Sequence, residues 1–319
     1  MFTRVAAGAL LGAFMASAAL AILTFYRPAV TFEFDADLPR SLTSGFYPVE
    51  RTSDQTFAWT TPLATVTLRG IDRHAAWRCS VHLRGARPAG FPPAVTRVGV
   101  DGVTRATHSP GGGYQAIAID VPSQPGASAM ILSISTTPPF VPGASDTREL
   151  GVQVDRLECA PANGGFVRPP AGALGAVATA GAAFGAVFAI LSPTLVVSLL
   201  GSLLFAAALA VTVNTGVGAY ARAYLDWAAP VALWIAAPLL AFGTSRTWLM
   251  RPIHPATGFV LGFSSAVMFI KIVTLLHPSK DVVDAVFHAH RLEWVLGGRY
   301  YFTQPMPGGV QFPYAIGLF

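Results

Sequence analysis

AGALGAVATAGAAFGAVFAILSPTLVVSLLGSLLFAAALAVTV, residues 171–213, carries no charged side chain. The run is too long for a single membrane helix, which needs about 20 residues. Ser192-Pro193 interrupts it, and because proline cannot continue a helix, we expect two helices, 171–191 and 193–213, in a tight hairpin. Gly181 and Gly185, with the many alanines, suit close helix packing within a membrane.

The composition of the whole chain agrees with a membrane protein. Of its 319 residues, 53% are hydrophobic and 12% are charged, and the mean hydropathy is +0.52. The net charge of +5 comes from 21 basic and 16 acidic residues that are scattered singly, which argues against a nucleic-acid partner. The sequence contains no phosphate-binding loop, no dinucleotide fingerprint and no internal repeat.

Further apolar runs predict membrane helices at 5–26, 227–243 and 255–276. The expected domains are therefore an anchor (1–28), a polar region (29–168) and a bundle of about four helices (169–276). For the first run a signal peptide is the alternative, since Ala16, Ala18 and Ala21 could suit a peptidase. Its length and its continuation into Arg27-Pro28 favour an uncleaved anchor.

Residues 29–168 predict a β-sandwich of jelly-roll type. Apolar and polar residues alternate at 65–69 and 78–84, and Asp101-Gly102 lies between the alternating arms of 97–105, which indicates a hairpin. Further strands are expected at 114–121, 130–135 and 150–157. Short strands separated by Gly/Pro turns are typical of such sandwiches.

Four aromatic residues of this region have two interpretations. They could form a platform on which a sugar stacks, or they could belong to the core, as such residues more often do: Trp59, Trp77, Tyr114 and Phe140.

The two cysteines, Cys79 and Cys159, both fall in the polar region. A disulfide is expected if this region is extracytoplasmic, because thiols stay reduced mainly in the cytosol. Closing so long a loop adds roughly 4 kcal/mol of stability in the chain-entropy model. Two unpaired buried thiols are the alternative.

Counting the spans gives an orientation. With the amino terminus in the cytoplasm, the β-sandwich lies outside, and Arg246 and Arg251 return to the cytoplasmic side, in agreement with the positive-inside rule. Arg222 is expected on an outer loop, and this position disagrees with the positive-inside rule. The expected location is a bacterial-type inner (plasma) membrane, crossed several times, with lipid as a partner.

Residues 277–311 form the extracytoplasmic loop with the most chemistry. At 3.6 residues per turn, Asp281, Asp284, His288 and Arg291 share one stripe of an amphipathic helix that could lie along the membrane surface. An interfacial helix with solvated charges is the alternative. Lys271, inside the preceding apolar run, could face a phosphate partner or extend to the interface.

This segment resembles a known family. Its features are similar to the first extracytoplasmic loop of GT-C glycosyltransferases. They are, in order, a membrane helix, His-Pro, Asp-x-x-Phe-His-x-x-Arg, glycines and a Pro-aromatic re-entry. That family transfers a sugar from a polyprenyl-phosphate carrier to an acceptor outside the cytoplasm. The resemblance implies Asp284, or second Asp281, as the general base, and it implies that His288 and Arg291 position substrate or phosphate.

The chain ends at Phe319, about nine residues into the next expected helix (312–319), whereas the family uses many more spans. We therefore expect the amino-terminal part of a membrane glycosyltransferase, inactive by itself, with a polyprenyl-phosphate sugar and a glycan acceptor as partners. No cofactor is expected, although Asp281, Asp284 and His288 could in principle ligate a divalent ion. The alternative is a non-catalytic, membrane-anchored β-sandwich that binds a glycan or a partner in the cell envelope.

Overall fold

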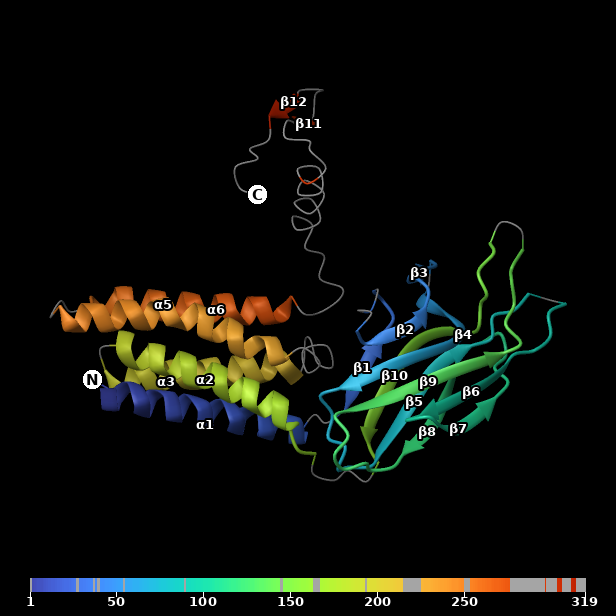
Figure 1. Cartoon of the computed structure of the whole chain (residues 1–319), viewed down its shortest axis with the longest axis horizontal. Coiled ribbons are helices and arrows are strands. Elements are labelled where there is room, and N and C mark those ends of the chain that lie inside the picture. The colour runs from blue at the N-terminus through green and yellow to red at the C-terminus, as the bar shows by residue number, and fades with distance from the viewer. Residues whose placement is uncertain are drawn as a thin grey trace. The chain divides into compact units, whose positions relative to one another are not determined.

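The structure is a computed structural model with two compact units, residues 1–279 and 280–319. It describes residues 2–26, 29–36, 38, 41–53, 55–88, 90–143, 146–162, 167–192, 194–214, 225–249, 253–275, 296, 303–305 and 311–313. In the second unit the described elements are β11 (Thr303–Pro305) and β12 (Gln311–Pro313), which pair antiparallel. The first unit contains a helix bundle and a β domain (Figure 1).

Five helices of the first unit are long and apolar enough to cross a membrane. They are α1 (Phe2–Tyr26), α2 (Ala171–Leu191), α3 (Leu195–Asn214), α5 (Ala228–Trp248) and α6 (Pro255–Thr274), and a short 3-10 turn, η1 (Leu225–Trp227), precedes α5. Helix α5 runs five residues beyond the predicted end at Gly243, and in this extension the hydroxyls of Thr244 and Ser245 are paired because they donate to carbonyls of the preceding turn.

Trp227 and Trp248 bracket α5 and are 70% and 83% exposed. At 1.5 Å per residue they lie about 31 Å apart, which matches the thickness of the hydrocarbon core of a bilayer. Tryptophan is enriched at both membrane interfaces, since its ring is apolar while its N–H needs a polar partner. The length of α5 and its two end residues therefore fit a membrane span.

Helix α2 lies at the centre of the bundle and contacts the other four helices. Its antiparallel contact with α1 is backbone to backbone, with Gly8 and Gly12 of α1 facing Gly185 and Gly181 of α2. A Cβ atom on Gly12 would overlap the carbonyl oxygen of Gly181. Ala16, also on α1, is fully buried in the hydrophobic cluster of the bundle, so α1 packs as one of its helices, and the uncleaved anchor stays a prediction.

The β domain is built around β4 (Thr56–Arg69), whose two halves pair with different partners. Its first half pairs with β10 (Gln153–Pro161), and its second half pairs with β9 (Ala129–Thr137), both antiparallel. The strand order is β7-β6-β9-β4-β10-β5-β8, and β7 and β8 contact each other at the far ends of this path. The result is an antiparallel sandwich with a barrel-like closure.

The other strands are β1 (Val30–Glu33), β2 (Thr43–Phe46), β3 (Glu50–Arg51), β5 (Trp77–Arg84), β6 (Val95–Val100), β7 (Val103–His108) and β8 (Gln115–Val121). The hairpin turn expected at Asp101-Gly102 joins β6 and β7, and both residues have positive φ, 50° and 80°. Strand β10 was predicted at 150–157 but begins three residues later. Leu150 instead bridges to Phe140, and a side chain on Gly151 would overlap the hydroxyl oxygen of Thr60.

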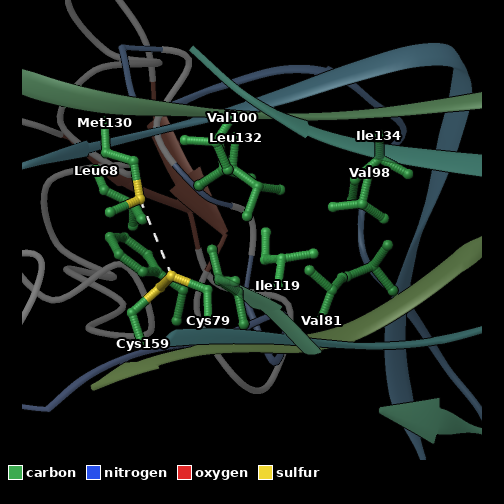
Figure 2. Close-up of a cluster of buried hydrophobic side chains, with 14 of the residues drawn as sticks. Leu68, Cys79, Val81, Val98, Val100, Ile119, Met130, Leu132, Ile134 and Cys159 are labelled. Atoms are coloured by element: carbon green, nitrogen blue, oxygen red, sulfur yellow. Dashed lines mark hydrogen bonds between the residues drawn. A yellow bond between two sulfur atoms is a disulfide. The ribbon is translucent and has the colours of Figure 1, made fainter. Parts of the chain in front are cut away.

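The core lies between the two layers of the sandwich. Val81 and Ile119 point inward from β5 and β8, and they face Leu132 and Ile134 of β9 (Figure 2). Cys79 and Cys159 face each other across β5 and β10 and form a disulfide with an S–S bond of 2.03 Å. The disulfide sulfur of Cys79 lies 3.9 Å from Sδ of Met130 on the opposite layer, so the bridge is part of the core.

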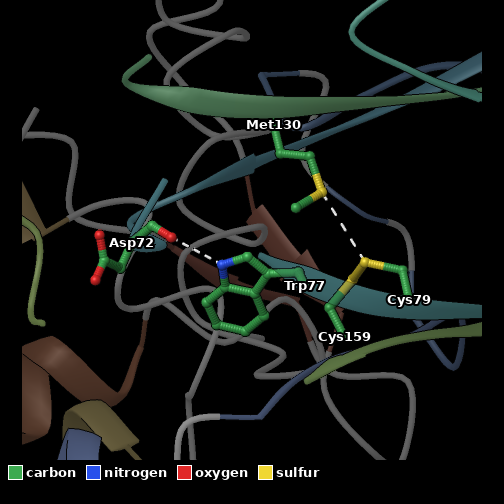
Figure 3. Close-up of a disulfide and its surroundings, with 5 residues drawn as sticks. All are labelled: Asp72, Trp77, Cys79, Met130 and Cys159. Carbon is green, nitrogen blue, oxygen red and sulfur yellow. Dashed lines mark hydrogen bonds between the residues drawn. A yellow bond between two sulfur atoms is a disulfide. The ribbon is translucent and has the colours of Figure 1, made fainter. Parts of the chain in front are cut away.

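Asp72 fixes the segment that leads from β10 to α2. Its carboxylate accepts hydrogen bonds from the backbone N–H groups of Arg168 and His74, each at 2.9 Å, and its carbonyl accepts from the indole N–H of Trp77 at 2.8 Å (Figure 3). Burial by itself would raise the pKa of Asp72, but the hydrogen bonds from Arg168 and His74 outweigh it and hold this pKa below its ordinary value.

Replacing Gly12 by leucine should separate α1 from α2, because no side chain fits against the carbonyl of Gly181. Overpacking of this kind costs about 1–3 kcal/mol, so the thermal unfolding temperature of the detergent-solubilised chain should fall by several degrees. Gly175→Leu on α2 is the matched control, since a Cβ there meets nothing within 4 Å. Equal unfolding temperatures for the two variants would contradict the backbone contact.

Asp72→Asn should lower the unfolding temperature at neutral pH by roughly 2–4 °C for each kcal/mol lost. Because the folded pKa is depressed, the carboxylate stabilises the fold above its unfolded pKa, and this stabilisation is lost as the pH falls through the folded value. The gap between wild type and variant should therefore narrow in acid. Asp120→Asn, an exposed carboxylate paired with Arg78, serves as control, and a gap independent of pH would rule out the proposed linkage.

Candidate functional site

The candidate site residues of the predicted glycosyltransferase loop lie outside the described residues: Asp281, Asp284, His288 and Arg291. Lys271 is described. It lies in the last turn of α6 and, with Phe263, Ser264, Val267 and Met268, lines an open hollow of about 330 Å³. Its ammonium has no ion pair within the described part of the chain, and no group of three or more metal-ligating side chains occurs there.

The β domain brings together a different set of side chains. Arg84 of β5 is paired with Gln153 of β10, which is paired in turn with Trp59 of β4. Tyr114 directly precedes β8 and continues the register in which Leu83 is paired with Gln115. Four residues therefore form one row across neighbouring strands: Tyr114, Arg84, Gln153 and Trp59. We call it the cross-strand row.

The row lies on the face of its sheet that points away from the main core, and Trp59 and Gln153 are themselves buried on that face. Along β5 the inward residues Cys79, Val81 and Leu83 are buried in the core, and alternate residues of a strand point to opposite faces. Arg84 therefore points outward, and so do its partners in the row. The row is thus separated from the core by the thickness of one sheet.

The guanidinium of Arg84 is held in a fixed position. Its Cζ atom lies 4.8 Å from the ring centre of Tyr114 and 5.6 Å from that of Phe57. Its Nε donates to the side-chain carbonyl of Gln153, which is only 4% exposed. The guanidinium of Arg84 makes no ion pair with a described residue, and it interacts with the phenol of Tyr114, on whose pKa it has a lowering effect. A planar cation is thus oriented by two rings and an amide, with one edge left open.

Further aromatic residues pack around the row. Phe57, Trp59, Phe140 and Leu150 form a buried cluster separate from the main core, and Tyr47, Ala86 and Tyr114 pack against it. Burial raises the pKa of the Tyr114 phenol, whereas the Arg84 cation acts in the opposite sense and Asp155 adds to the rise. The carboxylate of Asp155 is therefore within electrostatic range of the row.

Two other arginines brace the loops around this cluster. Arg148 lies 5.2 Å above the ring of Tyr47 and pairs with Glu50 at 2.7 Å and Asp146 at 2.8 Å. Asp146 and Glu50 raise the pKa of Arg148, and the pKa of Asp146 falls because Arg148 donates to it. Because its partners are already in place, Arg148 is a structural clamp.

Arg87 is the second clamp. Its terminal nitrogens donate to the backbone carbonyls of Pro92 and Pro138, and its Cζ atom lies 5.3 Å from the ring centre of Phe140. It therefore ties the loop after β5 to the loop after β9. Burial lowers its pKa.

Of the two interpretations of the four aromatic residues, the core interpretation holds for Trp77, Trp59 and Phe140, which are buried in hydrophobic clusters. Trp77 is not part of a platform. It is fully buried in the main core, because it lies on the same face of β5 as Cys79. Trp59, Tyr114 and Phe140 do lie together on the outer side, although Trp59 and Phe140 are mostly buried. Arg84 is not among the residues predicted for a site. The alternation of the segment 78–84 could have indicated Arg84, since it is the last residue of that segment that points outward.

Comparison with known proteins gives structural likeness only. No family model and no curated protein matches the chain. The β domain is similar to the C-terminal CBM6 of LamC, a laminarinase from Zobellia galactanivorans, at 8% identity and a TM-score of 0.28, covering 41% of this chain and 98% of that one. It is also similar to a family 35 carbohydrate binding module from Clostridium thermocellum, at 9% identity and a TM-score of 0.28, covering 42% and 98%.

A third similar structure is the CBM36-1 domain of a xylanase from the hindgut metagenome of Trinervitermes trinervoides, at 11% identity and a TM-score of 0.26, covering 42% of this chain and 98% of that one. At such identities and TM-scores, these likenesses do not bear on what this chain binds.

Proposed function

We propose that this chain is a membrane-anchored glycan-binding protein, with the sugar seated on the outer face of the β domain at the cross-strand row. The observation that carries the proposal is Arg84, which is oriented by Phe57, Tyr114 and Gln153 while it makes no ion pair with a described residue. The helices serve as the anchor.

The composition of the row suits a sugar. A sugar presents hydroxyl groups that need planar hydrogen-bonding partners, and C–H faces that pack on aromatic rings. Arg84 supplies N–H donors, and the ring of Tyr114 supplies the apolar wall. Because Arg84 is already fixed, binding costs little side-chain entropy.

The chain also offers support for placing the β domain outside the cytoplasm. A buried disulfide between Cys79 and Cys159 fits an oxidising compartment. Arg4, near the start of α1, donates to the carbonyl of Ser192 just after α2. One cationic group therefore lies at the end of the bundle where α1 begins and α2 ends. Arg246, near the end of α5, belongs to that same end by the alternation of the helices.

The glycosyltransferase function stays a prediction that rests on the resemblance of residues 271–319. Its proposed base, Asp284, lies outside the described residues, so no contact or distance supports it. The glycan-binding proposal has the firmer basis because its residues and distances are described.

Binding of the full chain, in detergent or lipid nanodiscs, to an array of neutral and acidic oligosaccharides tests the proposal. Removal of charge-assisted hydrogen bonds costs about 1.5–3 kcal/mol, so Arg84→Ala should weaken glycan binding by roughly 10- to 100-fold. The matched control is Arg78→Ala, which lies on the same strand and face but is exposed and pairs with Asp120. This control should bind as wild type does.

Two results would overturn the proposal. One is a wild-type chain that binds no glycan on the array, and the other is equal binding by Arg84→Ala and wild type. Sugar transfer from a polyprenyl-phosphate donor by the purified chain, with no such binding, would favour the glycosyltransferase instead.

A further inference from the structure

We infer that the glycan taken at the cross-strand row carries a carboxylate, as a uronic acid does. This inference rests on the proposed function and narrows it to a ligand class. It starts from the charge balance of the arginines in the β domain.

Two other arginines that are packed into this domain, Arg73 and Arg148, have carboxylate partners. Arg73 is buried and lies 2.5 Å from a carboxylate oxygen of Asp101, and Arg148 pairs with Glu50 and Asp146. Arg87 donates to two backbone carbonyls. Arg84 is half-buried, yet the described groups that contact its guanidinium, namely the amide of Gln153 and the side chains of Tyr114 and Phe57, are all neutral.

A half-buried cation with no counterion favours an anion that completes it. Two rings cover Arg84 and reduce its contact with water, so the electrostatic attraction for an incoming anion is stronger than at an open surface. Asp155 acts on the pKa of Tyr114, but no ion pair within 4.0 Å joins it to Arg84. The open edge of the guanidinium therefore has no internal carboxylate.

The shape of the open edge selects the kind of anion. Nε is engaged by Gln153, whereas Nη1 and Nη2, the planar pair of terminal donors, have no carboxylate within 4.0 Å among the described residues. Such a pair matches the two oxygens of a carboxylate, and parallel N–H···O bonds add orientation as well as strength. The rings of Tyr114 and Phe57 lie beside this edge, where the C–H face of the same sugar can pack.

Methyl glucuronide and methyl glucoside, which differ only at C6, are the probes for this inference. The full chain in nanodiscs should bind the glucuronide at least about 10-fold more tightly, since a charge-assisted pair is worth about 1.5–3 kcal/mol. Raising the salt concentration should weaken the binding of methyl glucuronide and leave the binding of methyl glucoside unchanged. Binding is measured by ligand-observed NMR or calorimetry.

Three variants separate the causes of this preference. Arg84→Gln should reduce the preference to about one, because it removes the cation. Arg84→Lys should retain part of the preference, because it keeps the charge but loses the planar fork. Arg78→Gln, on the same strand and face, should keep the wild-type preference, and thermal unfolding of each variant reports whether it folds.

The outcomes distinguish this inference from the proposed function. If wild type binds both probes equally and Arg84→Gln weakens both equally, the row binds sugars but the carboxylate inference is wrong. If a preference for the glucuronide survives in both Arg84 variants, the inference is also wrong, because the carboxylate is then read elsewhere. If neither probe nor any larger oligosaccharide binds, both proposals fail.

Discussion

Strand β4 holds the β domain together because it belongs to both layers of the sandwich. Its first half is hydrogen-bonded to β10 and its second half to β9, so one continuous backbone carries the sheet from one layer into the other. At the crossing point Thr60 is fully buried, and its hydroxyl accepts from the backbone N–H of Val152 while its backbone pairs with Val152 and Gly151. These bonds pair backbone groups of Thr60, Gly151 and Val152 that burial would otherwise leave without water.

The same strand explains where the candidate site lies. Because β4 joins β10 at Trp59, the outward positions of β4, β10 and β5 line up, and Trp59, Gln153 and Arg84 become neighbours although they are far apart in the sequence. The inward positions of these strands form the core around the Cys79–Cys159 disulfide (Figure 2). Core and candidate site are thus the two faces of one sheet, and the register that buries one also assembles the other.

The helix bundle follows a different rule. Lipid is as apolar as leucine, so burial of apolar surface does not drive these helices together, and close backbone approach takes its place. Gly8 and Gly12 on α1 meet Gly181 and Gly185 on α2, while α5 and α6 leave large side chains such as Trp234 and Phe259 exposed. The glycine-lined centre and the apolar outside are what a bundle surrounded by lipid requires.

Much of this architecture follows from the sequence. The uncharged run at 171–213 predicts the α2–α3 hairpin, and the alternation at 78–84 predicts β5, because membrane length and strand parity are local properties of the chain. The short β1, β2 and β3, and the first half of β4, were missed, since their pairing depends on distant strands. Strand β10 was misplaced because close packing under Thr60, and not local pattern, decides where it begins.

The site shows the same division. The sequence by itself determined that residues 29–168 form a β domain with Cys79 and Cys159 in it, and that apolar helices flank it. It could not determine that Tyr114, Arg84, Gln153 and Trp59 form one row, because that row depends on the register of four strands. Register is set by long-range hydrogen bonding and core packing, and a shift by one residue would turn Arg84 toward the core. Only the tertiary structure decided which arginine stands open between two aromatic rings.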